Sequence, residues 1–214
     1  MKRGVFITFE GPEGSGKSTH IRRLQDRLEA CGRDTLLTRE PGGTRTGEAV
    51  RRLLQHDSSD DDIARRTEVL LFCASRAQLV DQVVRPALDR GAWVLCDRFT
   101  DSTLAYQGFG RGFAVEELRR LNDFATGGLA PDLTLLLDVT VEEGRRRLAA
   151  RAGGCDRIER AERPFHERLR RGYLELAAAE PARFRVVPTH GPSAETSEAI
   201  WRLVQERFPE LAAP

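Results

Sequence analysis

Short apolar runs alternate with amphipathic segments along most of the chain. Five runs rich in Val, Ile, Leu and Phe predict buried strands, at residues 5–10, 35–39, 92–97, 133–139 and 184–188. Between them, apolar residues recur at intervals of three and four and predict helices, at residues 17–31, 47–55, 66–88, 101–107, 115–125, 141–151, 164–179 and 194–208. Pro86 should kink the 66–88 helix or start a new turn in it. Strands that alternate with helices favour an α/β fold, with a mostly parallel sheet covered on both faces.

The loop after the first predicted strand matches a phosphate-binding pattern. Residues 11–18 are GPEGSGKS, which fits G-x-x-x-x-G-K-[ST] between a strand and a helix. The glycines allow backbone N–H groups to point at phosphate oxygens, and the following helix adds its positive end. Lys17 would reach the β- and γ-phosphates of a nucleotide, and Ser18 would offer a hydroxyl to Mg²⁺. The expected nucleotide-binding residues are Gly11, Pro12, Glu13, Gly14, Ser15, Gly16, Lys17, Ser18 and Thr19.

The use of lysine narrows the class of nucleotide-binding protein. Of the 34 basic residues only Lys2 and Lys17 are lysines, so the single internal lysine occupies the position that the motif requires. The same scarcity excludes a GTPase with the usual guanine-reading N-K-x-D segment. A motor or transporter ATPase is normally larger than 214 residues, and the pattern therefore favours a small-molecule kinase.

Charge balance and apolar run length limit the partners. The 34 basic and 33 acidic residues leave a net charge of +1, without the global positive field typical of nucleic-acid binding. No apolar run approaches the ~20 residues that span a bilayer, and the N-terminal residues lack the cleavage region of a signal peptide. We therefore expect a cytoplasmic protein that binds neither nucleic acid nor membrane.

Two pairs of residues outside the loop carry candidate chemistry. Asp97 and Arg98 end the third predicted strand, where parallel strands face the ligand crevice. Asp97 can hold Mg²⁺ through a water and Arg98 can bridge two phosphates, although a surface ion pair is the alternative. Phe72 and Arg76 share one helix face and together suit a flat base with carbonyl oxygens. The alternative for this second pair is a core phenylalanine with a solvated arginine.

An arginine-rich stretch around Gly153 and Gly154 predicts a mobile lid over about residues 145–163. Arginines on a closing lid can neutralise charge during phosphoryl transfer. Arg151 and Arg157 flank the two glycines and are the candidates for this role. The three arginines before them are expected to face solvent, namely Arg145, Arg146 and Arg147. With this lid, residues 1–214 are expected to form one P-loop kinase domain.

Five separated segments resemble those of bacterial thymidylate kinases, in the order and spacing of that family. They are FEGPEGSGKST at 9–19, TREPGGT at 38–44, LFCASR at 71–76, DRFTDSTLAYQG at 97–108 and DRIE at 156–159. The resemblance implies a P-loop nucleoside-monophosphate-kinase-like fold with a five-stranded parallel sheet. It also implies that ATP, with Mg²⁺, phosphorylates dTMP to dTDP for dTTP synthesis, and that the protein is a homodimer.

The resemblance further implies roles for single residues. Phe72 would stack on thymine, Arg76 and Thr103 would address its polar edge, and Tyr106 would lie beneath the deoxyribose, where it hinders a 2′-hydroxyl. The implied dTMP-binding residues are Glu10, Arg39, Phe72, Arg76, Arg98, Ser102, Thr103, Tyr106 and Gln107. The expected catalytic residues are Lys17, Asp97, Arg98, Arg151 and Arg157, with Mg²⁺ at Ser18 and, through a water, at Asp97.

One departure and two alternatives qualify this interpretation. Some relatives carry an arginine within the P-loop where this chain has Glu13, so the lid is expected to supply that cation. One alternative is another nucleoside or nucleotide kinase of the same architecture, such as a thymidine kinase with Glu10 as its base. The other is a non-catalytic P-loop module that binds nucleotide as a switch. Four intact residues argue against such a module, namely Lys17, Ser18, Asp97 and Arg98.

Overall fold

The computed structural model describes residues 3–55, 63–150 and 162–211 of the chain. At its centre, five parallel strands form a sheet with the order β2-β3-β1-β4-β5. The strands are β1 (Phe6–Glu10), β2 (Thr35–Arg39), β3 (Trp93–Asp97), β4 (Leu133–Asp138) and β5 (Phe184–Pro188). All five predicted strands are confirmed, with ends that differ by one residue at most.

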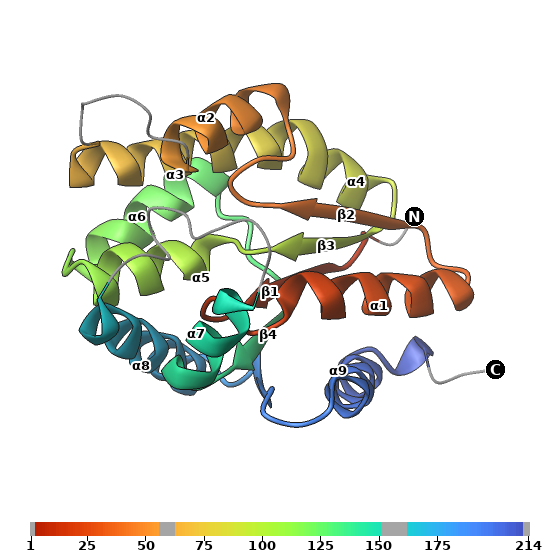
Figure 1. Cartoon of the computed structure of the whole chain (residues 1–214). Helices are drawn as coiled ribbons and strands as arrows, with labels where there is room; N and C mark the ends of the chain where they lie inside the picture. Colours follow the sequence, from red (N-terminus) through yellow and green to blue (C-terminus); the bar gives the residue numbers. More distant parts are fainter. Residues whose placement is uncertain (1–2, 56–62, 151–161, 212–214) are drawn as a thin grey trace.

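Helices cover both faces of the sheet, so the predicted α/β fold is confirmed (Figure 1). Ile7 and Phe9 of β1 pack against α1 and α9 on one face, whereas Phe6 packs against η1 and α4 on the other. The helices are α1 (Lys17–Ala30), α2 (Arg45–Gln55), α3 (Arg65–Leu79), α4 (Arg85–Asp89), α5 (Thr100–Thr103), α6 (Val115–Thr126), α7 (Val141–Ala149), α8 (Arg163–Ala179) and α9 (Ser193–Arg207), with the π-helical segments η1 (Val80–Val84) and η2 (Leu104–Gly110) and the 3₁₀ turn η3 (Pro209–Leu211). None of the helices in the described segments is long and apolar enough to cross a membrane.

Two π-helical segments change the predicted helices. The sequence predicts one helix over residues 66–88, but η1 separates α3 from α4, and α4 begins at Arg85. Pro86 has no N–H for the carbonyl of Gln82, and its ring would clash with that carbonyl in a regular α-helix. The wider π turn just before the proline gives the ring room, and a new helix then starts. A second difference concerns residues 101–107, for which the sequence predicts one helix. The structure has the short helix α5 there, followed directly by the π-helical segment η2.

All five strands end at the same edge of the sheet because they are parallel. This edge collects the phosphate loop after β1 and the Asp97–Arg98 pair at the end of β3, where a doubly wound sheet binds its ligands. Arg98 N donates to Phe9 O at 2.9 Å, which ties the end of β3 to the start of the loop. Residues 151–161, with Arg151 and Arg157, lie outside the described residues.

Candidate active site

The phosphate loop joins β1 to α1 and lies against α7. Gly16 is the N-cap of α1 with a φ of 89°, and no side chain in the described segments caps the first N–H groups of the helix. Gly14 has a φ of +72°, and a Cβ added there would lie 2.5 Å from Gly144 O of α7. The loop therefore requires glycine at both positions, and it leaves the positive end of α1 open to an anion.

Lys17 begins α1 and folds back over the loop. Its ammonium group donates to the carbonyl oxygens of Gly11 and Pro12 at 3.0 and 2.9 Å and to Ser15 Oγ at 3.3 Å. Burial and, to a lesser extent, the nearby Arg98 guanidinium lower the pKa of Lys17 to about 8. These three acceptors are uncharged, so the ammonium charge remains available to a phosphate group in the loop.

Ser18 and Asp97 meet beside the loop, as expected for a magnesium site. Ser18 Oγ at the start of α1 donates to Asp97 Oδ2 at the end of β3, at 3.0 Å. Hydroxyl and carboxylate oxygens are hard ligands, and Mg²⁺ usually binds few protein groups together with waters and substrate phosphates. The chemistry and position of these two side chains therefore fit Mg²⁺.

Arg98 follows β3 in a left-handed conformation, with a φ of 73°. Its Nη2 donates to Glu13 Oε1 at 2.8 Å, and its guanidinium lies 4.9 Å from the centre of the Tyr106 ring. Its Nη1 donates to Gly11 O and Ser102 Oγ, each at 3.2 Å. This conformation is strained for a residue with a side chain. The contacts hold it in place and set the charge of Arg98 between the phosphate loop and η2.

Glu13 brings a negative charge into the loop. Burial would raise its pKa, but the charges of Arg98 and Lys17 outweigh burial and lower the pKa of Glu13 to about 2. Its Oε1 also accepts a hydrogen bond from Tyr106 Oη at 2.7 Å. Glu13 therefore offsets one of the two cations beside it and cannot itself stabilise negative charge on a reacting phosphate.

Glu10, at the end of β1, is fully buried in a network that reaches α8. Its Oε1 accepts from Phe99 N at 2.7 Å, and its Oε2 accepts from Ser102 Oγ at 2.6 Å and from Tyr173 Oη at 2.9 Å. Burial and, to a lesser extent, the negative charge of Asp101 raise the pKa of Glu10 to about 7. Tyr173 is a member of this network that the sequence interpretation missed, because nothing local distinguishes it from a core residue of α8.

The buried Glu10 carboxyl should make stability depend on pH. Its pKa is about 7 in the folded protein against a reference of 4.5, so the folded state holds the proton more tightly between these values. Its stabilising effect is present below about pH 4.5 and is lost as the pH rises to about 7, at a cost of up to roughly 3 kcal/mol. Glu10→Gln resembles the protonated form and should remove this loss, which thermal unfolding of both proteins in a pH series measures. Parallel pH profiles of wild type and variant would contradict the prediction.

Phe72 and Arg76 share a face of α3 but differ in environment. Arg76 is 1% exposed, and its Nε and Nη2 donate to Glu40 Oε2 at 2.8 and 2.6 Å. Its Nη1 donates to Asn122 Oδ1 at 2.6 Å. Phe72 is partly exposed and belongs to none of the buried clusters among the described residues. The alternative of a core phenylalanine with a solvated arginine is therefore wrong, because Glu40, directly after β2, compensates the charge of the buried arginine.

The remaining predicted acceptor residues differ in their partners. Thr103 in α5 is 1% exposed, and its Oγ1 has no hydrogen-bond partner among the described residues. Gln107 in η2 is also buried, and its Nε2 donates to Glu68 Oε1 of α3 at 2.9 Å. Arg39 lies apart from the Glu10 network, since it pairs with Glu48 of α2 at 2.9 Å and its side chain is 50% exposed. Buried polar atoms normally have partners, so the Thr103 hydroxyl is an exception within the described residues.

The sequence of the chain matches the thymidylate kinase family over residues 9–200. The chain belongs to this family. It is 51% identical to a thymidylate kinase of Deinococcus radiodurans, in a match that covers 97% of this chain and 99% of the relative. It is 50% identical to thymidylate kinases of Nitratidesulfovibrio vulgaris (98% of this chain, 100% of the relative) and Pseudomonas putida (97% and 96%). The chain is thus a kinase, and the predicted family is confirmed.

In this member of the thymidylate kinase family, one expectation about the arginine-rich stretch is wrong. The sequence predicts that Arg147 faces solvent, but its Nη1 donates to Gly14 O at 3.3 Å and its Nη2 to Thr189 O at 2.6 Å. Gly144 lacks a side chain and lets α7 approach the loop closely, which places Arg147, one turn later, over the loop. Arg146 is 78% exposed and pairs with Glu143, as expected of a solvent-facing residue.

Proposed function

We propose that this kinase transfers the γ-phosphoryl group of ATP to the phosphate of dTMP at the carboxyl edge of the sheet, yielding ADP and dTDP. The observation that carries the proposal is that Lys17 of the phosphate loop and Arg98 beside it meet the Glu10 network and η2 in one place. Two negatively charged phosphates must approach each other, and such a reaction depends mainly on positioning and on nearby cations. No general base is needed, because the acceptor phosphate oxygen is already anionic.

Within this proposal the donor and acceptor sides use different residues. The N–H groups of the loop and Lys17 bind the ATP phosphates, while Ser18 and, through a water, Asp97 would hold Mg²⁺. When bound, the ion would neutralise phosphate charge. Phe72 stacks on thymine and Thr103 offers its free hydroxyl to the base edge, with Tyr106 under the sugar. Since both substrates are cytoplasmic metabolites, the cytoplasm is the proposed location.

A coupled assay of ADP release tests this function. ADP release should be fastest with dTMP in a panel of nucleoside monophosphates. Thymidine serves as a further acceptor, and a reaction without acceptor serves as the blank. Faster turnover of thymidine than of dTMP would support the thymidine kinase alternative. ADP release that no acceptor stimulates would support the non-catalytic module.

Thr103→Val is expected to raise the KM for dTMP by ~5- to 50-fold and to leave the protein as stable as the wild type or more stable. The change keeps the shape of the side chain and removes a buried hydroxyl without a partner, so only the complex with dTMP loses a hydrogen bond. Arg76→Ala is a poorer test, because it would leave Glu40 buried without its counter-charge. Steady-state kinetics and thermal unfolding of Thr103→Val measure both effects. An unchanged KM would exclude contact between Thr103 and dTMP.

We also propose that the chain forms a homodimer through α2, α3 and α6. The middle helix, α3, packs against both α2 and α6. Each of the three carries one large exposed apolar side chain: Leu53 is 58%, Leu70 is 56% and Phe124 is 90% exposed. Such side chains on adjacent helices indicate an interface.

Phe124→Asp should therefore convert a dimer of about twice 24.0 kDa into a monomer of 24.0 kDa in sedimentation equilibrium. A charge placed in an apolar interface loses its water without gaining a partner. Arg22→Asp, on the exposed side of α1, serves as the control and should leave the dimer intact. A wild-type protein that sediments as a monomer would contradict the proposal.

A further inference from the structure

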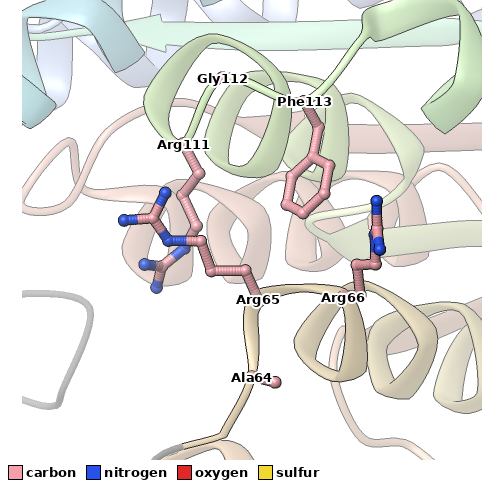
Figure 2. A pocket seen from close by; sticks show the side chains of 6 residues that line it. All are labelled: Ala64, Arg65, Arg66, Arg111, Gly112 and Phe113. Atoms are coloured by element: carbon pink, nitrogen blue, oxygen red, sulfur yellow. The ribbon is translucent and has the colours of Figure 1, made fainter.

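A pocket of about 430 Å³ lies between the start of α3 and the turn after η2 (Figure 2). Figure 2 shows two arginines that reach into it from the α3 side, while a third arginine and a phenylalanine come from the opposite side. The lining residues are Ala64, Arg65, Arg66, Arg111, Gly112 and Phe113. None of them belongs to the nucleotide or acceptor residues predicted above.

The lining of this pocket carries an excess of positive charge. Arg111 pairs with the buried Glu68 through Nε and Oε1 at 2.8 Å, which fixes the position of its guanidinium. Arg65 and Arg66 are exposed and form no ion pair within the part of the chain that the structure describes. Three arginines therefore line the pocket, and Glu68 pairs with one of them, Arg111.

The start of α3 adds a further attraction for anions. Its N-cap is Ala64, and no side chain among the described residues caps the first N–H groups of this 15-residue helix. These N–H groups and the helix dipole favour a negative charge at this end. On the other side the partly exposed Phe113 offers an aromatic surface. Several arginines, open N–H groups and a ring in one cavity suit a phosphate-bearing ligand.

We propose that this pocket is a second polyphosphate-binding site, separate from the phosphate loop. Its ligand is a chain of phosphates, either inorganic or part of a nucleoside triphosphate whose base lies against Phe113. Glu68 connects the pocket to the acceptor side, because it pairs with Arg111 and also accepts from Gln107 at 2.9 Å. A phosphate that competes for Arg111 therefore weakens dTMP binding through Gln107. This coupling rests on the proposed function, whereas the binding site does not.

Calorimetric titration of tripolyphosphate tests the site directly. The protein first receives one equivalent of a bisubstrate analogue, adenosine and thymidine joined through five phosphates, which fills the proposed active site. Arg65→Ser/Arg66→Ser should weaken tripolyphosphate binding at least ~10-fold. The control Arg22→Ser/Arg202→Ser removes the same charge from exposed positions of α1 and α9 and should stay within about twofold. Equal affinities of all three proteins, or no binding to the wild type, would overturn the proposal.

Two further readouts identify the ligand source and the coupling. If dTTP binds more tightly than tripolyphosphate and Phe113→Leu removes the difference, the ligand is a nucleotide, whereas equal affinities indicate inorganic polyphosphate. At saturating ATP, tripolyphosphate should raise the KM for dTMP at least twofold more in the wild type than in Arg65→Ser/Arg66→Ser. An equal KM change in both proteins would overturn the coupling. If the analogue does not bind at all, the proposed function fails, and the comparison of wild type with Arg65→Ser/Arg66→Ser still reports on the pocket.

Discussion

Lys17→Ala is expected to lower kcat by at least ~10³ in a protein that stays folded. The ammonium group is buried in the loop, where the structure gives it only uncharged acceptors. Without Lys17, the phosphates of ATP and dTMP would meet beside Arg98, whose charge Glu13 already offsets. Steady-state kinetics with both substrates varied measure the loss.

Folding should survive this change, because burial already works against the charged form of Lys17. Thermal unfolding of Lys17→Ala should lie close to that of the wild type, which separates a lost reaction from a lost fold. Arg22→Ala, on the exposed face of the same helix, serves as the control and should keep full activity. A pure Lys17→Ala protein with a near-normal rate would show that the phosphate loop is misassigned.

Contiguous patterns predict most of the fold and the donor side of the site. The five strands follow from apolar runs within single segments, and the phosphate loop is one continuous stretch of eight residues. Its function depends on backbone N–H groups and on the helix end that directly follows, so local sequence is sufficient to predict it. Ser18 and Asp97 could be paired because parallel strands end at one edge of the sheet.

Partners far apart in the chain could not be predicted in the same way. Tyr173 meets Glu10 across 163 residues, and Arg76 finds Glu40 across 36 residues. Which acid faces which arginine depends on how helices pack on the sheet, and this chain offers many arginines in similar local patterns. Arg147 shows the same limit, since its contact with the loop depends on the close approach of α7. The π-helical segments were also missed, because the apolar spacing does not distinguish them from α-helix.

The charged side chains of the described site do not compensate the negative charge of the two substrates. Lys17 and Arg98 supply two positive charges beside the loop, and Glu13 and Asp97 supply two negative ones. ATP and dTMP add several negative charges to this balance, so additional positive charge must enter when they bind. Arg147 is already engaged by Glu143, Gly14 O and Thr189 O.

Besides a bound Mg²⁺ ion, the arginine-rich segment between α7 and α8 is a source of such positive charge in the sequence. Its flanking helices are both attached to the site, since Gly144 of α7 packs on the loop and Tyr173 of α8 donates to Glu10. Arg151 and Arg157 belong to this segment, outside the described residues. Their predicted role is to meet the transferring phosphoryl group when both substrates are bound.

Replacing Arg151 or Arg157 by alanine should therefore lower kcat by ~10²–10⁴ and leave the KM for dTMP almost unchanged. This pattern is expected of an interaction made mainly in the transition state, because a cation that arrives on closure contributes little to the first encounter with dTMP. Arg146→Ala is the matched control: Arg146 is 78% exposed and pairs with Glu143, so its removal should change kcat less than ~2-fold. Steady-state kinetics of the three variants, with ATP and dTMP each titrated, make the comparison. If kcat stays at the wild-type value in both Arg151→Ala and Arg157→Ala, the additional cation does not come from this segment.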